Sequence, residues 1–455
     1  MSIKFHSSGR AIAPVVLAAS HRWRIATLGF VLWLLLGVAC TLQAIPGILI
    51  TNLPPFGSVQ NLSGVVTGVE PANYKVAAFI YVPGYGWASK PTCAQPLTSI
   101  NPDRSWTTSI TTATSDASAT RVAAVLVPNG SALECVQGQP FLTNAFSTAA
   151  ASTVITRPSP GRRWLNFAGY DWWVKTSANR VGPGPNYFSD STNNVWVDDS
   201  GNLHLKITYR SNQWQCAELV SARSFGRGSY RFQLLSDVNT LDRNVVLGLF
   251  TWSDDPAFAH REIDVECSRW GNQADLRNAQ FVVQPYDIPG HLVRYTVPAQ
   301  LTNSTHSFNW ESNRVVFNSQ RGAYSSTPAP TNLISGWTYT FATPQPGDEN
   351  VRLNLWLMSG KPPSNGQESE VIIRSFEFSP LNAPSPGALL NPRATPHGAQ
   401  FDLLTQPDRR YALQSSEDLA RWQDTYVFIA TNISTPIRLP LPTPGPYFFR
   451  AQTLP

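Results

Sequence analysis

Apolar and polar residues alternate at every second position in many short stretches of this 455-residue chain. Clear examples are 203–207 (LHLKI) and 230–234 (YRFQL), and each is bounded by turn-forming residues. The segment 245–250 (VVLGLF) is almost continuously apolar, which is typical of a strand covered on both faces. No stretch of comparable length repeats its apolar residues with a helical period. The pattern therefore predicts an all-β protein built around a two-sheet sandwich.

Changes in composition divide the chain into modules. Segments rich in Pro, Gly, Ser, Thr and Ala are expected as linkers at 151–161 and 381–396. They separate an N-terminal β module at 46–150, a central domain at 162–380 and a small C-terminal β module at 397–455. The two outer modules are expected to be small β-sandwich-like domains that flank the central sandwich.

Residues 1–44 resemble a secretory leader. Basic residues precede an uncharged apolar run at 25–39, and small residues end that run. Cleavage is expected after Ala39 or Ala44, and an uncleaved membrane anchor or a lipid on Cys40 are the alternatives. The apolar part is shorter than the roughly 20 residues of a spanning helix. The protein is therefore expected to be secreted or held at the cell surface, and to meet the membrane only if the leader is uncleaved or lipidated.

Charge argues against nucleic acid as a partner. Charged residues make up 14 % of the chain, below the roughly 25 % of typical soluble domains. The net charge of +5 arises largely in residues 1–44, which contain four basic residues and no acidic residue. The rest of the chain is nearly neutral and has no run of Lys or Arg, so no basic surface for nucleic acid is expected.

Four cysteines follow the leader. Cys93 could pair with Cys135, and Cys216 with Cys267, because each pair lies within one module. Buried free thiols are an equal alternative for the second pair. No Cys-x-x-Cys motif or histidine cluster suggests a metal site.

Three acidic residues alternate with two β-branched residues at Glu262-Ile263-Asp264-Val265-Glu266. In a strand, the three carboxylates share one face and the apolar side chains enter the other. Neighbouring like charges repel, so a solvated strand gains nothing from this row. A calcium site is the other alternative, but one short strand supplies too few converging oxygen ligands. A pair of carboxylates in different protonation states is what glycoside hydrolysis requires.

Several segments together resemble glycoside hydrolase family 16, the β-glucanase family, over about residues 164–380. In chain order these segments are 226–230 (GRGSY), 248–252 (GLFTW), 262–266 (EIDVE), 279–281 (AQF), 306–310 (HSFNW) and 353–356 (LNLW). The resemblance implies a curved, antiparallel, concanavalin-like jelly roll with a substrate cleft on its concave face. It also implies hydrolysis by double displacement with retention of anomeric configuration.

The resemblance also assigns roles to the acidic row. Glu262 matches the nucleophile, Glu266 the general acid and base, and Asp264 the electrostatic helper between them. The five-residue spacing is that of lichenase-like and xyloglucan-transferase-like members. Laminarinase-like members carry one extra residue, a β-bulge.

Further residues match substrate contacts of the family by position and strand parity. They are Trp252, His260, Gln280, Gln284 and Trp356. Strand parity places His260 on the same face as the nucleophile, where lichenase-like members have Trp. For each aromatic residue, packing in the core is the alternative role.

The expected function is that of an exported, endo-acting, retaining glycosidase that hydrolyses a β-linked polysaccharide. A transglycosylase using the same site and a non-catalytic, lectin-like glycan-binding protein are the alternatives. No cofactor is expected, and the sequence does not locate the structural calcium that some family members bind. In the N-terminal module, Tyr81, Tyr85 and Trp87 either bind carbohydrate or fill the module's own core. No function is assigned to the C-terminal module.

Overall fold

The computed structural model of the chain describes residues 3–5, 45–381, 389–395, 398–404, 410–417, 421–429, 434–440 and 447–454. Apart from Ile3–Phe5, the expected leader therefore lies outside the described residues. The chain divides into two compact units, one formed by residues 42–381 and the other by 1–41 together with 382–455. Within the described ranges, no helix is both long and apolar enough to cross a membrane.

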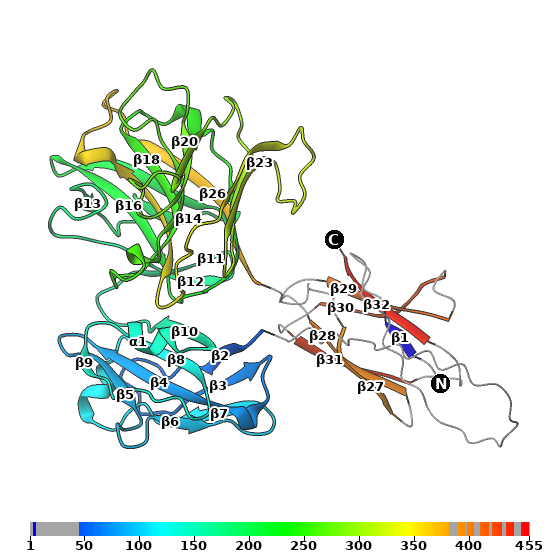
Figure 1. Cartoon of the computed structure of the whole chain (residues 1–455). Coiled ribbons are helices and arrows are strands. Elements are labelled where there is room, and N and C mark those ends of the chain that lie inside the picture. The colour runs from blue at the N-terminus through cyan, green and yellow to red at the C-terminus, as the bar shows by residue number, and fades with distance from the viewer. Residues whose placement is uncertain are drawn as a thin grey trace, which may run out of the picture. The chain divides into compact units, whose positions relative to one another are not determined.

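The N-terminal module is a β-sandwich (Figure 1). Its strands are β2 (Gly47–Asn52), β3 (Leu62–Thr67), β4 (Tyr74–Val82), β5 (Gly86–Lys90), β6 (Leu97–Ser99), β7 (Ser105–Thr108), β8 (Arg121–Pro128), β9 (Gln137–Gln139) and β10 (Ala151–Thr156). One sheet has the order β10-β8-β4-β5-β9, with β6 also paired to β4, and the other has the order β2-β3-β7. Trp106 lies in the core between the sheets. A second core lies on the outer face of the larger sheet. There Trp87 of β5 and Phe146 of the short helix α1 (Thr143–Ser147) belong to one buried cluster.

The aromatic residues that suggested carbohydrate binding mostly serve this second core. Trp87 is fully buried, and Tyr81 packs edge-on against it with ring centroids 5.5 Å apart. Only Tyr85 is exposed, at 55 % of its surface. The expectation that these rings fill the module's own core therefore fits two of the three. Cys93 and Cys135 form a disulfide in this module, whereas Cys216 and Cys267 are buried free thiols.

The structure differs from the expected linker at 151–161. Residues 151–156 form strand β10, which pairs along its whole length with β8. This segment (ASTVIT) is rich in β-branched residues, which favour extended backbone packed in a sheet. At its end, Ile155 bridges Arg223 of the central domain, and the Thr156 N–H donates a hydrogen bond to the Ala222 carbonyl at 2.6 Å.

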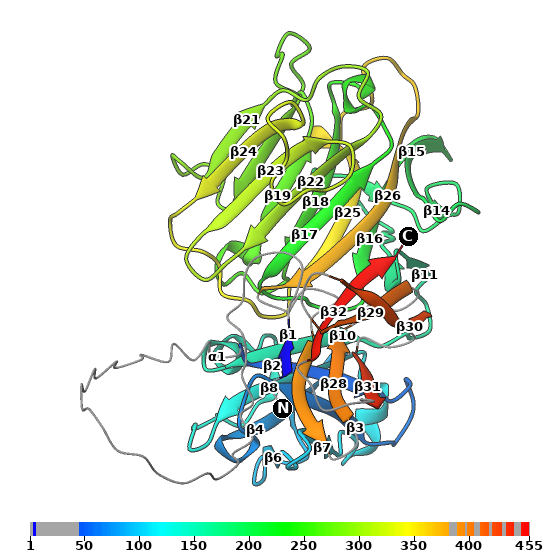
Figure 2. The same cartoon turned by 90° about the vertical axis from the view of Figure 1, so that its right-hand side faces the viewer.

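The central domain is one long antiparallel sheet that folds over into two layers (Figure 2). The strand order is β21-β20-β19-β18-β25-β16-β15-β26-β17-β22-β23-β24, with β11 to β14 attached near β15 and β16. The bounds are β11 (Trp164–Phe167), β12 (Tyr170–Val174), β13 (Tyr187–Phe188), β14 (Val195–Val197), β15 (Leu203–Arg210), β16 (Gln213–Ser221), β17 (Gly228–Leu234), β18 (Val245–Trp252), β19 (Ile263–Cys267), β20 (Ala279–Val283), β21 (Leu292–Tyr295), β22 (Ser304–Trp310), β23 (Val315–Arg321), β24 (Leu333–Tyr339), β25 (Asn350–Leu357) and β26 (Ser369–Pro380).

A single apolar core fills the space between these two layers. Leu249 of β18 and Val265 of β19 belong to the same buried cluster as Phe232 of β17 and Phe317 of β23. Alternate residues of β18 and β19 enter this core, so the residues between them occupy the outer face. The prediction of an all-β protein with a curved antiparallel jelly roll is thus confirmed, and the outer face of β19 carries the acidic row.

The C-terminal module has two small sheets. One pairs β27 (Leu389–Thr395), β28 (Gly398–Leu404) and β31 (Ser434–Pro440). The other has the order β1-β32-β29-β30, from β1 (Ile3–Phe5), β32 (Tyr447–Leu454), β29 (Arg410–Ser416) and β30 (Gln423–Ile429). Strand β27 lies where the sequence predicted part of a linker at 381–396, so the module begins earlier than expected.

Candidate active site

The strand register places the acidic row at the centre of the outer face. Glu266 lies opposite Gly248 on β18 and opposite Gln280 on β20. Asp264 lies opposite Phe250. Glu262 precedes β19, and its carbonyl accepts a hydrogen bond from the Gln284 N–H at 3.2 Å. The three carboxylates therefore lie in one row along β19, with β18 on one side of it and β20 on the other.

Two glutamine side chains hold this row. Gln280 Nε2 donates to Glu266 Oε2 at 2.8 Å, and Gln284 Nε2 donates to Asp264 Oδ2 at 3.1 Å. The Tyr286 N–H in turn donates to Gln284 Oε1 at 2.9 Å, which fixes the orientation of that amide. The structure thus brings both predicted glutamines to the acidic row, where they contact the carboxylates directly.

Burial and mutual repulsion favour protonation of the row. Burial, and next the charge of Glu266, raise the pKa of Glu262 to about 8. Burial raises the pKa of Glu266 to about 7, against the hydrogen bond from Gln280, which lowers it. Burial, and then the charges of the two glutamates, raise the pKa of Asp264 well above its usual range. At neutral pH the row therefore holds fewer negative charges than carboxyl groups.

The proton is best placed on Asp264. A hydrogen bond between the two side chains lowers the pKa of Glu262 and raises that of Asp264, as expected when a protonated Asp264 donates to an ionised Glu262. The Arg352 guanidinium also lowers the pKa of Glu262. Asp264 is buried, whereas Glu262 and Glu266 each keep part of their surface accessible. Glu262 and Glu266 are thus the groups that a ligand can reach. The buried Asp264 favours the ionised form of Glu262 through their hydrogen bond.

An aromatic pair lies beside the first glutamate. The rings of Trp252 and His260 stack with centroids 4.1 Å apart and 7° between their planes. Trp252 Nε1 donates to Asp254 Oδ1 at 3.3 Å, and His260 Nδ1 lies 2.9 Å from the Ser253 carbonyl oxygen. The prediction that His260 continues the strand was wrong. It lies in the short 3₁₀ turn η4 (Ala259–Arg261) with φ of 62°, and strand parity does not apply to it.

Trp356 is placed differently from the other predicted contacts. It is only 9 % exposed and packs edge-on against Trp270 with centroids 6.0 Å apart. Its strand position opposite Val246 leaves it two residues beyond Asn354 on the same face. The ring is therefore almost fully covered on this face, and it belongs to the same cluster as the apolar core.

Sequence reasoning missed two polar residues next to the row, Glu218 and Asn354. Glu218 of β16 is fully buried and binds Lys175 Nζ at 3.0 Å and Arg352 Nη1 at 3.1 Å. Asn354 Nδ2 donates to Glu218 Oε2 at 3.4 Å, while its Oδ1 is buried and has no partner among the described residues. The signals were a lone acid within the apolar run CAELV and the polar residue within LNLW.

Asn354 approaches the row because residue 248 is glycine. A Cβ on Gly248 would lie 2.4 Å from Asn354 Oδ1, and Gly248 pairs with Glu266 on one side and Asn354 on the other. The missing side chain leaves a free carbonyl oxygen beside the second glutamate.

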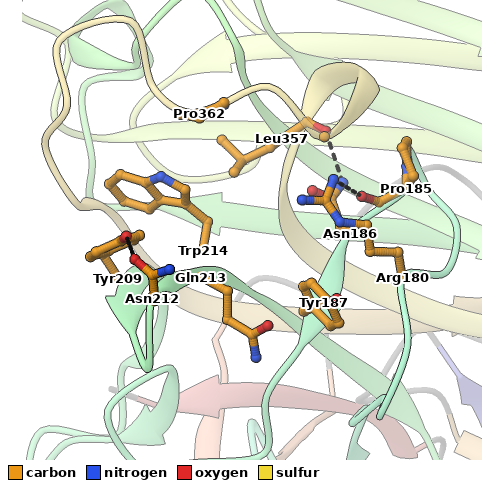
Figure 3. Close-up of a pocket in the computed structure, with 11 residues that line it drawn as sticks. Arg180, Pro185, Asn186, Tyr187, Tyr209, Asn212, Gln213, Trp214, Leu357 and Pro362 are labelled. Carbon is orange, nitrogen blue, oxygen red and sulfur yellow. Dashed lines mark hydrogen bonds between the residues drawn. The ribbon is translucent and has the colours of Figure 1, made fainter.

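A separate hollow lies further along the same layer (Figure 3). It has a volume of about 280 Å³. Its lining includes Arg180, Tyr187, Tyr209, Trp214 and Leu357. None of the predicted site residues lines it. Among the described residues, no group of three or more His, Cys, Asp or Glu side chains is arranged to hold a metal ion.

Comparison with known proteins finds similar structures but no matching sequence family. No protein-family model matches this sequence, and no curated protein sequence matches it. A Bacillus licheniformis β-glucanase is 18 % identical, with 49 % of this chain and 99 % of that chain covered and a TM-score of 0.36. A pseudo β-1,3-glucanase of Mycobacterium tuberculosis is 17 % identical, with coverage of 49 % and 93 % and a TM-score of 0.36. A Bacteroides ovatus glycoside hydrolase family 16 protein in complex with a G4G4G3G product is 13 % identical, with coverage of 46 % and 94 % and a TM-score of 0.35.

Proposed function

We propose that this chain is an exported, endo-acting glycosidase that hydrolyses a β-linked polysaccharide with retention of configuration. The observation that carries the proposal is the row of Glu262, Asp264 and Glu266, in which two half-buried glutamates flank a buried aspartate and burial raises the pKa of all three carboxyl groups. The ordered motifs that resemble glycoside hydrolase family 16 support the same reaction. The disulfide Cys93–Cys135 supports export, because such bonds persist in oxidising compartments.

Each group has a defined step in double displacement. Glu262 attacks the anomeric carbon in its ionised form and forms a glycosyl-enzyme. The hydrogen bond from Asp264 and the charge of Arg352 favour this form, because both lower the pKa of Glu262 against the effect of burial. Glu266, whose pKa is raised to about 7 by burial, is protonated in a large fraction of molecules near neutral pH and donates its proton to the departing glycosidic oxygen. In the second step, Glu266 removes a proton from water, which attacks the same carbon and releases Glu262. Retention follows because the configuration inverts twice.

The polar groups around the row suit a sugar. The Asn354 Oδ1 can accept a hydrogen bond from a hydroxyl, and the half-buried rings of Trp252 and His260 offer an apolar surface to a pyranose. Gln280 and Gln284 are already bonded to carboxylates. Their main role is therefore to donate hydrogen bonds to the carboxylates, and contact with a sugar hydroxyl is a secondary role.

A transglycosylase and a binding protein remain the rival functions. A transglycosylase forms the same glycosyl-enzyme and transfers the sugar to a hydroxyl instead of water. A lectin-like protein needs no buried carboxyl row, and burying such groups costs free energy that binding alone does not recover. This cost favours catalysis over simple binding.

The test is a reducing-end and product-size assay of the full chain on laminarin, mixed-linkage glucan, xyloglucan, agarose and carrageenan. We expect one glycan to be shortened by internal cleavage, and Glu266→Gln to slow that cleavage about a hundredfold or more. Product chains longer than the substrate would favour the transglycosylase. Binding without turnover on every glycan, unchanged in Glu262→Gln, would favour the lectin.

A further inference from the structure

The segment that leads into Glu262 has an unusual backbone. Phe258, Ala259, His260 and Arg261 have φ angles of 56°, 49°, 62° and 53°. Residues other than glycine rarely adopt such backbone angles. Four of them in succession persist only where the surrounding structure holds them in place. The next residue is the proposed nucleophile, so whatever holds this turn also fixes the start of the acidic row.

The turn closes a loop that begins at Ser253. The Ser253 N–H donates to the His260 carbonyl at 2.7 Å, and His260 Nδ1 lies 2.9 Å from the Ser253 carbonyl. These two contacts set the His260 ring against Trp252. The contacts between Ser253 and His260 thus close the loop 253–261. Further contacts are required to hold its two ends, Ser253 and Arg261, in place.

The N-terminal module anchors the first end. Arg121, at the start of β8, donates through Nη2 to Asp348 Oδ2 at 2.7 Å. The other oxygen of that carboxylate, Asp348 Oδ1, accepts a hydrogen bond from Ser253 Oγ at 2.5 Å. Asp348 is buried, so this ion pair is shielded from solvent. One carboxylate thus links the N-terminal module to the loop.

The same module anchors the second end. Thr143 of α1 donates through Oγ1 to Asp255 Oδ2 at 2.6 Å, and Arg261 Nη1 donates to the same oxygen at 3.1 Å. Arg261 is fully buried and also donates through Nε to the Gln345 carbonyl at 2.9 Å. Phe146 of α1 also lies near Arg261, since both side chains approach Gly347. A Cβ on this glycine would lie 2.6 Å from Arg261 Nε and 3.0 Å from the Phe146 ring.

We propose that the N-terminal module is a built-in part of the active site, in which Arg121 and Thr143 act as positioning residues that clamp the two ends of the loop 253–261. This clamp holds the left-handed turn, and through it the His260 ring and the backbone of Glu262. The module is thus an intramolecular support for catalysis and not a tethered glycan-binding domain. The kinetic part of this inference rests on the proposed glycosidase function.

The test removes each clamp in the full chain and compares it with a matched change elsewhere in the module. Arg121→Met is paired with Lys75→Met, because Lys75 donates to the exposed Ser99 Oγ at 3.0 Å within the same module. Thr143→Val is paired with Thr107→Val, which removes the exposed Ser63 to Thr107 bond at 3.0 Å. The conservative change Thr143→Ser keeps the hydroxyl and serves as the rescue. Thermal unfolding of every variant confirms that it is folded.

Two readouts are needed, one of which does not depend on activity. Hydrogen exchange followed by mass spectrometry reports on the amides of 253–262, and steady-state kinetics gives kcat and KM. We expect at least tenfold faster exchange in this segment for Arg121→Met and Thr143→Val. We expect kcat to fall at least fivefold with a smaller change in KM, near-parent values for Thr143→Ser, and no change for the two controls.

The outcomes separate the clamp from the proposed reaction. Faster exchange in a chain that turns over no glycan would support the clamp while the glycosidase proposal fails. Unchanged exchange in both clamp variants would overturn the inference. Faster exchange with unchanged kcat in an active enzyme would overturn it as well, because the loop would then have no influence on the acidic row.

Discussion

The imidazole of His260 lies flat against the indole of Trp252, with ring centroids 4.1 Å apart, although the two residues belong to different backbone elements. Trp252 ends a regular strand, and His260 reaches it from a left-handed turn. The pair borders Glu262 at the start of the acidic row. The conformation of the loop therefore determines where the His260 ring lies relative to Trp252.

Removing the imidazole tests the value of this stack. Aromatic pairs contribute about 0.5–1.5 kcal/mol beyond burial, so we expect His260→Ala to lower kcat/KM about threefold to tenfold. His260→Phe keeps the ring and loses the contact with the Ser253 carbonyl, so its loss should be smaller. Steady-state kinetics of the two variants on the same glycan checks this order. An equal loss in both would assign the effect to the hydrogen bond alone.

The protonation of the row also affects folding stability. Folded Glu262 has a pKa of about 8 and Glu266 of about 7, whereas an unfolded Glu titrates at about 4.3. Between these values the folded state binds more protons than the unfolded state, so the free energy of unfolding falls as pH rises. We expect this fall between about pH 6.5 and 8.5 in the parent protein, and a smaller fall in Glu262→Gln.

Urea unfolding at both pH values measures the difference between the free energies of unfolding. His306 acts in the opposite direction, because burial lowers its pKa to about 4, but its contribution is the same in every variant and cancels in the comparison. The exposed Glu70 provides the control variant Glu70→Gln, which should follow the parent protein. Parallel slopes for the parent and Glu262→Gln would contradict the assigned protonation of the row.

Gly248 provides a test of the close approach beside Glu266. Its φ lies outside the left-handed region, so Gly248→Ala introduces no backbone strain. The added Cβ must displace Asn354 Oδ1, which would lie 2.4 Å away. We expect kcat/KM to fall at least tenfold while the protein remains folded. In the control Gly336→Ala, the new Cβ meets Asn318 Oδ1 at 3.3 Å on another strand, and activity should persist.

The acidic row could be predicted because its logic is local. Alternation in a strand places Glu262, Asp264 and Glu266 on one face, and it places Gln280 and Gln284 on one face of their own segment. The structure adds the register that pairs Gln280 with Glu266. The fold class followed from the same two-residue period. These features depend only on strand geometry, which a single sequence encodes directly.

The loop before the row could not be predicted, because its conformation depends on distant contacts. No glycine marks the left-handed turn at 258–261, and its backbone angles are sustained by Asp255 and Asp348. Those carboxylates in turn depend on Arg121 and Thr143, more than 100 positions away in the sequence. The strand β10 was misread as a linker because its Ala, Ser and Thr residues resemble one. Its β-branched residues favour a strand, and the distant pairing with β8 completes it.

The most direct test of the account is to trap the glycosyl-enzyme. The full chain is incubated with an activated 2-deoxy-2-fluoro β-oligoglucoside, in which fluorine slows the second displacement, and its peptides are then examined by mass spectrometry. The account predicts time-dependent inactivation and one added glycosyl group on the peptide that contains Glu262, with no label in Glu262→Gln. A stable label on another residue, or turnover of glycan through a chain that is never labelled, would contradict it.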